Sequence, residues 1–307
     1  MFFLFLFLEK KIFYRKNIKI KIFFKNDFEK LMRNYKDEIK AGERFQFGAN
    51  WKFFLKNISQ DQINYAENEI KDKLEVENLN NRTFLDIGSG SGLSSLAAKK
   101  LGAKVYSFDY DLESVECTRS LKKIYFADDK YWEITNGSIL DKDFIKKFGK
   151  FNIVYSWGVL HHTGRLWEAL ENTLNLVEKN GILFIAIYND MGVKSKRWLI
   201  IKKLYNQLPF ILRWIVFIPA FLKIWLPVFI KDFLKLKPLY SWMNYSKKES
   251  RGFKPFTDAI DWIGGYPYEF AKPEEIYNYC FKRGFILLKL KTCGGGMGCN
   301  EYIFKKI

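Results

Sequence analysis

The sequence has little cysteine and little histidine for its length. Its 307 residues include four cysteines, which form no CxxC pair and are too few for a disulfide framework. A reducing, cytoplasmic compartment is therefore expected. Cys293 and Cys299 are close in sequence but have no histidine near them, so we expect no four-ligand metal site there.

The amino-terminal region lacks the features of a secretory signal and of a membrane span. Met1 to Leu8 is apolar, but no charged residue precedes it and no small-residue cleavage site follows it. Eight residues also fall short of the roughly 20 that a spanning helix needs. Residues 1–41 are therefore interpreted as a basic, apolar tail that is disordered or meets a membrane surface, as an added edge strand, or as a start site assigned too early, with no catalytic role.

The excess of basic over acidic residues is confined to two segments. The chain has 51 Lys and Arg against 34 Asp and Glu, a net charge of +17. Residues 1–40 hold 11 basic and 5 acidic side chains, and residues 194–254 hold 14 basic and 2 acidic. Because the remainder is close to neutral, this charge does not predict a nucleic-acid partner for the central part of the chain.

From residue 82 onward, strand-like runs alternate with amphipathic helix-like runs, which predicts a parallel sheet with helices on both faces. The expected strands are 83–87, 103–108, 131–135, 151–157 and 181–188, and the expected helices are 93–101, 112–124 and 166–177.

A glycine loop, Gly88 to Gly92, connects the first strand to the first helix. Such a loop is typical of a nucleotide site, because bare backbone lets a ligand approach the start of the helix. A dinucleotide fingerprint would require glycine where this chain has Leu93. Asp86 instead precedes the loop and Asp109 ends the next strand, which suits an ammonium, a sulfonium and a ribose. This set of groups favours S-adenosylmethionine over NAD.

The motifs resemble the class I S-adenosylmethionine-dependent methyltransferases, from about residue 42 to the end of the chain. The resemblance lies in LDIGSGSG at residues 85–92, in Asp109, and in WGVLHH at residues 157–162. It implies an α/β, Rossmann-like fold with a seven-stranded mixed sheet, completed by an antiparallel hairpin of residues 285–292 and 301–306. It also implies S-adenosylmethionine as the cofactor. The cofactor residues that it implies are Asp86, Gly88, Ser89, Gly90, Gly92, Asp109, Tyr110, Ser138, Ile139 and Trp157.

The acceptor is harder to predict from the sequence. The run at residues 159–162 is similar to that of small-molecule methyltransferases such as the ubiquinone-biosynthesis O-methyltransferases, and the absence of proline after the fourth strand disfavours methylation of a base nitrogen. His161 and His162 are candidate general bases, or else they pack and orient the loop. Asp258, Asp261 and Glu269 are expected either to line the acceptor pocket or to lie in an exposed turn. His161, His162 and Asp261 are the candidate catalytic residues.

A basic, aromatic insertion at residues 191–255 follows the fifth strand. Its prolines, at 209, 219, 227 and 238, are expected to divide it into helices of about two turns. It is interpreted as a cap in a membrane interface, with a buried substrate lid and a true span as alternatives. Residues 194–254 are accordingly the expected contact with an anionic membrane surface.

Together these features predict one methyltransferase domain, residues 42–307, with a helical lid at residues 42–80 and the helical cap at 191–255. The predicted reaction is O-methylation of a small, hydrophobic or lipid- or glycan-linked acceptor. RNA methylation and non-catalytic binding of S-adenosylmethionine are the alternatives. The expected location is the cytoplasm, or the inner face of the membrane as a peripheral protein.

Overall fold

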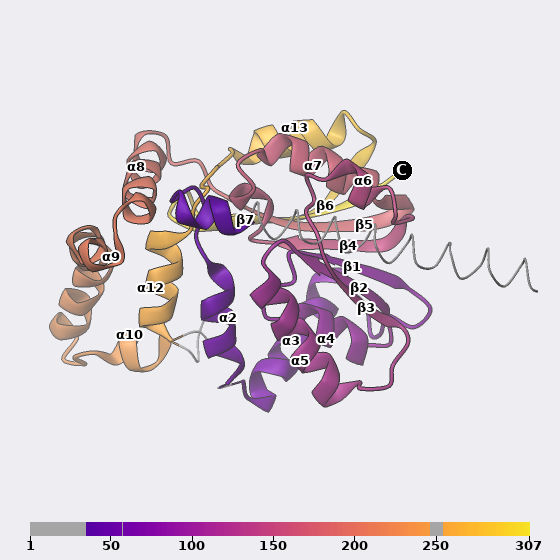
Figure 1. Cartoon of the computed structure of the whole chain (residues 1–307), viewed down its shortest axis with the longest axis horizontal. Coiled ribbons are helices and arrows are strands. Elements are labelled where there is room, and N and C mark those ends of the chain that lie inside the picture. The colour runs from indigo at the N-terminus through magenta and orange to yellow at the C-terminus, as the bar shows by residue number, and fades with distance from the viewer. Residues whose placement is uncertain (1–34, 57, 246–253) are drawn as a thin grey trace, which may run out of the picture.

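A seven-stranded mixed sheet forms the centre of the protein (Figure 1). The structure is a computed structural model that describes residues 35–56, 58–245 and 254–307. Most of the predicted amino-terminal tail, residues 1–34, lies outside the described residues. The strands are β1 (Thr83–Ile87), β2 (Lys104–Asp109), β3 (Trp132–Asn136), β4 (Phe151–Trp157), β5 (Val177–Tyr188), β6 (Phe285–Lys291) and β7 (Cys299–Lys306).

The strand order is β3-β2-β1-β4-β5-β7-β6. Strands β1 to β5 pair in parallel, and β7 runs antiparallel between β5 and β6. The predicted α/β, Rossmann-like sheet with a carboxyl-terminal antiparallel hairpin is therefore confirmed. Some of the expected bounds are wrong. Strand β5 begins at Val177 and not at residue 181, β7 begins at Cys299 and not at residue 301, and β2 and β3 are each shifted by one residue.

Helices cover both faces of the sheet (Figure 1). Helices α3, α4 and α5 pack on one face, and α6, α7 and α13 pack on the other. Helix α3 begins with a capping box between Ser59 and Gln62, and Asp111 caps α5 by accepting from the Glu113 amide. The bounds are α3 (Gln60–Leu74), α4 (Leu93–Lys100), α5 (Leu112–Tyr125), α6 (Lys142–Ile145), α7 (Leu166–Asn175) and α13 (Pro273–Phe281).

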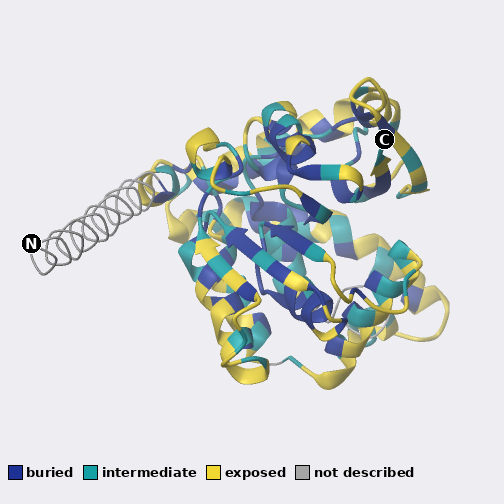
Figure 2. Ribbon diagram, turned by 90° about the vertical axis from the view of Figure 1, so that its right-hand side faces the viewer, coloured by how far each residue is buried: buried dark blue, intermediate teal, exposed yellow. Residues whose placement is uncertain are grey.

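Alternation along the central strands divides the core between the two faces. On β1, Phe84 packs with α3 and α4, whereas Leu85 and Ile87 pack with α7 and α13. Figure 2 shows the central strands buried and the outer sides of the helices exposed. Because both faces are covered, the strands read as nearly continuous apolar runs, which made them recognisable in the sequence.

The remaining helices lie beyond one end of the sheet (Figure 1). They are α2 (Phe47–Leu55), α8 (Val193–Gln207), η2 (Phe210–Leu212), α9 (Arg213–Leu234), α10 (Tyr240–Met243) and α12 (Pro255–Gly264). The prediction of two-turn helices in the insertion is wrong, because α9 is 22 residues long and contains Pro219 and Pro227. Both prolines lie on its exposed side, so the hydrogen bonds that they remove do not disturb its packed face.

Candidate functional site

A cavity of about 650 Å³ opens at the carboxyl ends of β1, β2 and β4. It extends from the glycine loop to α2, α12 and the loop between β6 and β7. Seven carboxyl side chains border it, against two cationic ones, Arg44 and Lys291. This balance favours a cationic or neutral ligand over a polyanion.

The glycine loop forms one wall of the cavity. Gly88 and Gly90 adopt positive φ angles of 74° and 55°, and the Gly90 amide donates to Asp109 Oδ2 over 2.9 Å. A Cβ on Gly90 would lie 2.9 Å from the Trp51 ring of α2, so only bare backbone fits between loop and lid. Ser89 also borders the cavity.

Gly92 differs from the other predicted cofactor residues, because it does not border the cavity. It is the residue before α4, with a φ of 82°. A Cβ there would lie 2.8 Å from the Thr118 Cα of α5. Gly92 therefore allows α4 and α5 to pack closely, and the predicted contact with the cofactor is replaced by a role in helix packing.

Asp86 is a buried carboxylate at the end of β1. It is 2% exposed, borders the cavity, and accepts a hydrogen bond from Ser95 Oγ of α4. Ser95 is in turn bonded to Ser107 of β2 at 2.7 Å. The hydroxyls of Ser95 and Ser107 therefore fix the orientation of the Asp86 carboxylate.

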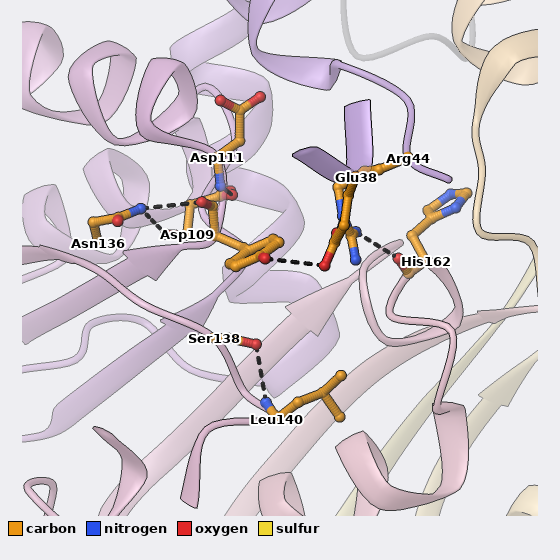
Figure 3. A network of polar contacts seen from close by, with 9 residues as sticks. Glu38, Arg44, Asp109, Asp111, Asn136, Ser138, Leu140 and His162 are labelled. Atoms are coloured by element: carbon orange, nitrogen blue, oxygen red, sulfur yellow. Dashed lines mark hydrogen bonds and ion pairs between the residues drawn. The ribbon is translucent and has the colours of Figure 1, made fainter. Parts of the chain in front are cut away.

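Asp109 ends β2 at the rim of the cavity. Its Oδ1 accepts from the Asp111 amide at 2.8 Å, and Asn136 donates to its backbone carbonyl (Figure 3). Burial and the neighbouring Asp111 carboxylate raise the pKa of Asp109 to about 7. Hydrogen bonds to this carboxylate from ligand hydroxyls would favour its charged form.

A residue group that the sequence analysis missed lies beside Tyr110, the residue that follows Asp109 (Figure 3). Residues 35–40 form a helix, and Glu38 on it accepts from Tyr110 and pairs with Arg44. Tyr35 packs edge-on against Tyr110 with 5.3 Å between the ring centres. Tyr35, Arg44 and Tyr110 all border the cavity. No motif marks residues 35–40, which is why the sequence predicts only a tail there, at residues 1–41.

The loop after β3 forms the opposite wall. Ile139 is 4% exposed, and Ser138 Oγ accepts from the Leu140 amide at 3.2 Å, which holds the loop in a tight turn (Figure 3). Both predicted residues border the cavity. Trp157, at the end of β4, also borders it, and its Nε1 donates to Glu301 of β7 at 3.3 Å.

The two histidines lie in η1 (Leu160–His162) at the cavity wall, and the backbone fixes opposite tautomers. The Tyr188 amide donates to His161 Nδ1, so a neutral His161 carries its proton on Nε2. His162 Nδ1 lies 2.6 Å from the Pro267 carbonyl, which only accepts, so its Nε2 carries a lone pair. Burial lowers the pKa of His162 to about 3 and that of His161 well below its ordinary value. Both rings are therefore neutral near pH 7.

His161 Nε2 is also a buried donor without a partner among the described residues. An unpaired buried donor is costly unless a ligand or a water molecule satisfies it. Because His161 borders the cavity, it can donate to an oxygen of a bound molecule. A general-base role is chemically less suited to it, since its Nε2 already holds the proton.

The far lobe of the cavity contains two carboxyl groups on one face of α12, Asp258 and Asp261. Tyr245 donates to Asp258 Oδ2 at 2.6 Å, and Asn50 of α2 donates to Asp261 Oδ1. Burial is the main reason that the pKa of Asp261 rises to about 7, and Asp258 adds to it. A carboxyl with this pKa can exchange a proton near neutral pH. We call this lobe the acceptor chamber.

The prediction that Glu269 lines the acceptor pocket is wrong. Its carboxylate lies away from the cavity and accepts from the Leu166 amide at 2.9 and 3.0 Å. Glu269 thus satisfies the first turn of α7, where a negative charge is also favourable. Asp258 and Asp261 lie on a helix, so the alternative of an exposed turn is wrong for both.

The sequence and the structure were compared with those of known proteins. Residues 60–218 match the family model described as a methyltransferase domain. The chain is 27% identical over 204 residues to the ubiquinone biosynthesis O-methyltransferase of Pelagibacter ubique, covering 65% of this chain and 75% of that protein. It is 47% identical over 58 residues to the ribosomal protein L11 methyltransferase of Prochlorococcus marinus, 19% of each chain.

Among solved structures, the magnesium protoporphyrin IX methyltransferase of Synechocystis with bound SAH matches with a TM-score of 0.49 and 14% identity, over 84% of this chain and 94% of that one. The family match spans more than half of this chain and includes the glycine loop, Asp109 and both histidines. The strand order of the sheet is also the order expected for class I enzymes. The chain belongs to the methyltransferase domain family and has the class I fold.

Proposed function

We propose that this methyltransferase moves the methyl group of S-adenosylmethionine to an oxygen of a small acceptor. The observation that carries the proposal is the continuity of one cavity, which joins the glycine loop and Asp109 to the Asp261 carboxyl. S-adenosylmethionine is the cofactor, and when bound it supplies a methyl activated by a sulfonium.

The residues at the inner end of the cavity fit this cofactor. Gly88 and Gly90 leave room for the methionine part, and Asp86 supplies negative charge for its ammonium. Asp109 would accept from the ribose hydroxyls, and Ser138 and Ile139 would flank the adenine. The excess of carboxyl groups suits a ligand that carries two positive charges, an ammonium and a sulfonium.

Asp261 is the proposed general base. Asn50 engages Oδ1 of its carboxyl group, so Oδ2 is in place to accept the proton of an acceptor hydroxyl as the oxygen takes the methyl. The acceptor hydroxyl would lose its proton to Asp261 and form an O–CH3 bond, while the S–CH3 bond breaks and its electron pair stays on the sulfur, which becomes neutral. His161 would donate to a second acceptor oxygen, while His162 shapes the wall, and in-line positioning supplies much of the rate.

We further propose that the acceptor is hydrophobic or linked to a lipid or glycan. Phe47, Trp51, Tyr188 and Trp262 present aromatic rings to the cavity. RNA is disfavoured because the carboxyl groups around the chamber would repel its phosphates. The proposed location is the cytoplasm, with peripheral binding to the inner face of the membrane.

Calorimetry and metabolite profiling test the proposal together. Intact protein should bind S-adenosylmethionine, Asp109→Ala should weaken binding more than about tenfold through the lost ribose bonds, and Asp143→Ala, an exposed acid on α6, should not. A strain lacking the gene should accumulate a species lighter by one methylene, which wild type clears and Asp261→Asn does not. Undiminished binding by Asp109→Ala would refute the cofactor site, and clearance by Asp261→Asn would refute the base.

A further inference from the structure

Helix α9 carries an apolar stripe on the side that faces away from the protein. The stripe residues recur every three or four positions and are between 45% and 72% exposed. A contiguous exposed apolar surface of this kind marks an interaction site on a soluble domain. The α9 stripe consists of Trp214, Ile215, Ile218, Leu222, Leu226, Ile230 and Phe233.

The opposite side of α9 is packed against the protein. Phe217, Ala220 and Trp225 are buried, and the Phe217 ring lies 5.5 Å from that of Phe256 on α12. The segment 210–234 is long and apolar enough to cross a bilayer. Crossing would require α9 to leave α8 and α12, so this packing supports a helix that lies along the protein surface.

The charges around the α9 stripe are mostly positive, which favours a negatively charged partner. Residues 193–245 contain ten basic side chains and one acidic side chain, Asp232. Asp232 is buried and bonded to Ser241, whereas Lys223, Lys231 and Lys235 are exposed beside the stripe. A second copy of this surface would meet it with the same positive charge and be repelled. An anionic bilayer offers apolar depth and opposite charge together.

We propose that the α9 stripe binds an anionic membrane with the helix axis parallel to the bilayer surface. The stripe side chains enter the boundary between headgroups and acyl chains, and the lysines remain at the level of the lipid phosphates. This position also accounts for the prolines, because Pro219 and Pro227 lie on the same outer side as the stripe and leave the packed face of α9 undisturbed.

This membrane surface lies one helix away from the acceptor chamber. Helix α12 packs against α9 through Phe256 and carries Asp258 and Asp261 into the cavity. Tyr245 connects the two, since its ring lies 5.3 Å from Trp225 of α9 and its hydroxyl bonds Asp258. If the proposed function holds, an acceptor dissolved in the bilayer has a short route to the base.

Vesicle flotation with the full chain tests the proposal. Wild type should float with phosphatidylcholine vesicles that contain phosphatidylglycerol and bind pure phosphatidylcholine weakly. Ile218→Glu combined with Leu222→Glu should lower the binding constant more than about tenfold, because apolar contact is lost and negative charge is added. Ile124→Glu, an exposed isoleucine on α5, is the matched control and should bind as wild type does. Replacing Lys231 with Gln should weaken binding to the anionic vesicles about fivefold.

Failure of this proposal can be distinguished from failure of the proposed function. Each variant is first checked for S-adenosylmethionine binding, which the α9 stripe should not affect. Full vesicle binding by the Ile218 and Leu222 variant would place the contact elsewhere, for example in residues 1–34, and would overturn the proposal. A wild-type protein that does not bind anionic vesicles would also overturn the proposal. The same holds if the wild type forms a dimer without vesicles and the Ile218 and Leu222 variant is a monomer.

Discussion

Replacing Asp261 with asparagine should stabilise the protein in a way that depends on pH. Burial raises the pKa of this carboxyl from 3.8 to about 7, Asp258 on the same helix adds to the rise, and Asn50 of α2 and Lys202 of α8 oppose it. Between these pH values the folded protein holds a proton that the unfolded chain has released. The stability of the wild type should therefore fall as pH rises from about 4 to about 7.

The size of the effect follows from this difference in pKa. A change from 3.8 to about 7 corresponds to about 4 kcal/mol, which is an upper limit because the site can relax around the charge. Asparagine keeps the shape and the oxygen that Asn50 donates to, but it carries no charge. We expect Asp261→Asn to raise the free energy of unfolding by about 2 kcal/mol above pH 7 and by less than about 1 kcal/mol near pH 4.5.

Urea unfolding near pH 4.5 and near pH 8 measures this difference. The matched control is Asp143→Asn, whose carboxylate is 88% exposed, and it should change little at either pH. Equal stabilisation of Asp261→Asn at the two pH values, or a loss of stability near pH 8, would refute the reasoning. The same variant should bind S-adenosylmethionine normally and lose turnover by a factor of about 100 or more, so a gain in stability would accompany the loss of activity.

Two further substitutions test the walls of the site. Gly90→Ala should lower the free energy of unfolding by about 1 to 2 kcal/mol and weaken cofactor binding, because the φ of Gly90 is 55° and a Cβ there would meet Trp51. Gly149→Ala is the control, because a Cβ there meets nothing within 4 Å, and calorimetry should find neither effect. Glu269→Ala should cost about 1 kcal/mol in thermal unfolding through the lost bond to the Leu166 amide. Its cofactor affinity should remain unchanged, and a loss there would contradict the capping role.

The central sheet could be predicted because its signals are local. Strands β1 and β4 have the expected bounds, and β2 and β3 each begin and end one residue later than expected. Buried parallel strands are short apolar runs that end at glycine or acidic residues, so pattern and position agree. The glycine loop and Asp109 were found for the same reason, since a nucleotide site at the carboxyl edge of a sheet requires a particular residue at a particular place.

The parts that the sequence analysis missed depend on contacts between distant segments. The proline penalty suggested short helices, but the packing of Phe217 and Trp225 outweighs it along α9. Tyr35 lies more than 70 residues from Tyr110, and no local pattern relates the two. An acidic residue near aromatic ones predicts a pocket for the acceptor, and Glu269 fits that pattern. Its actual partner is the Leu166 amide at the start of α7, more than 100 residues away, which the local sequence does not reveal.

The outer side of α9 and the inner side of α12 carry opposite charge, so a lipid with an anionic headgroup and a neutral molecule would be treated differently. The basic side of α9 attracts anionic headgroups, whereas Asp258 and Asp261 on the inner side of α12 repel them. An anionic lipid would thus hold the enzyme at the bilayer without entering the acceptor chamber. A neutral molecule with a hydroxyl group meets no such repulsion and can give its proton to Asp261. The membrane that binds the protein and the acceptor that it methylates are therefore expected to be chemically distinct.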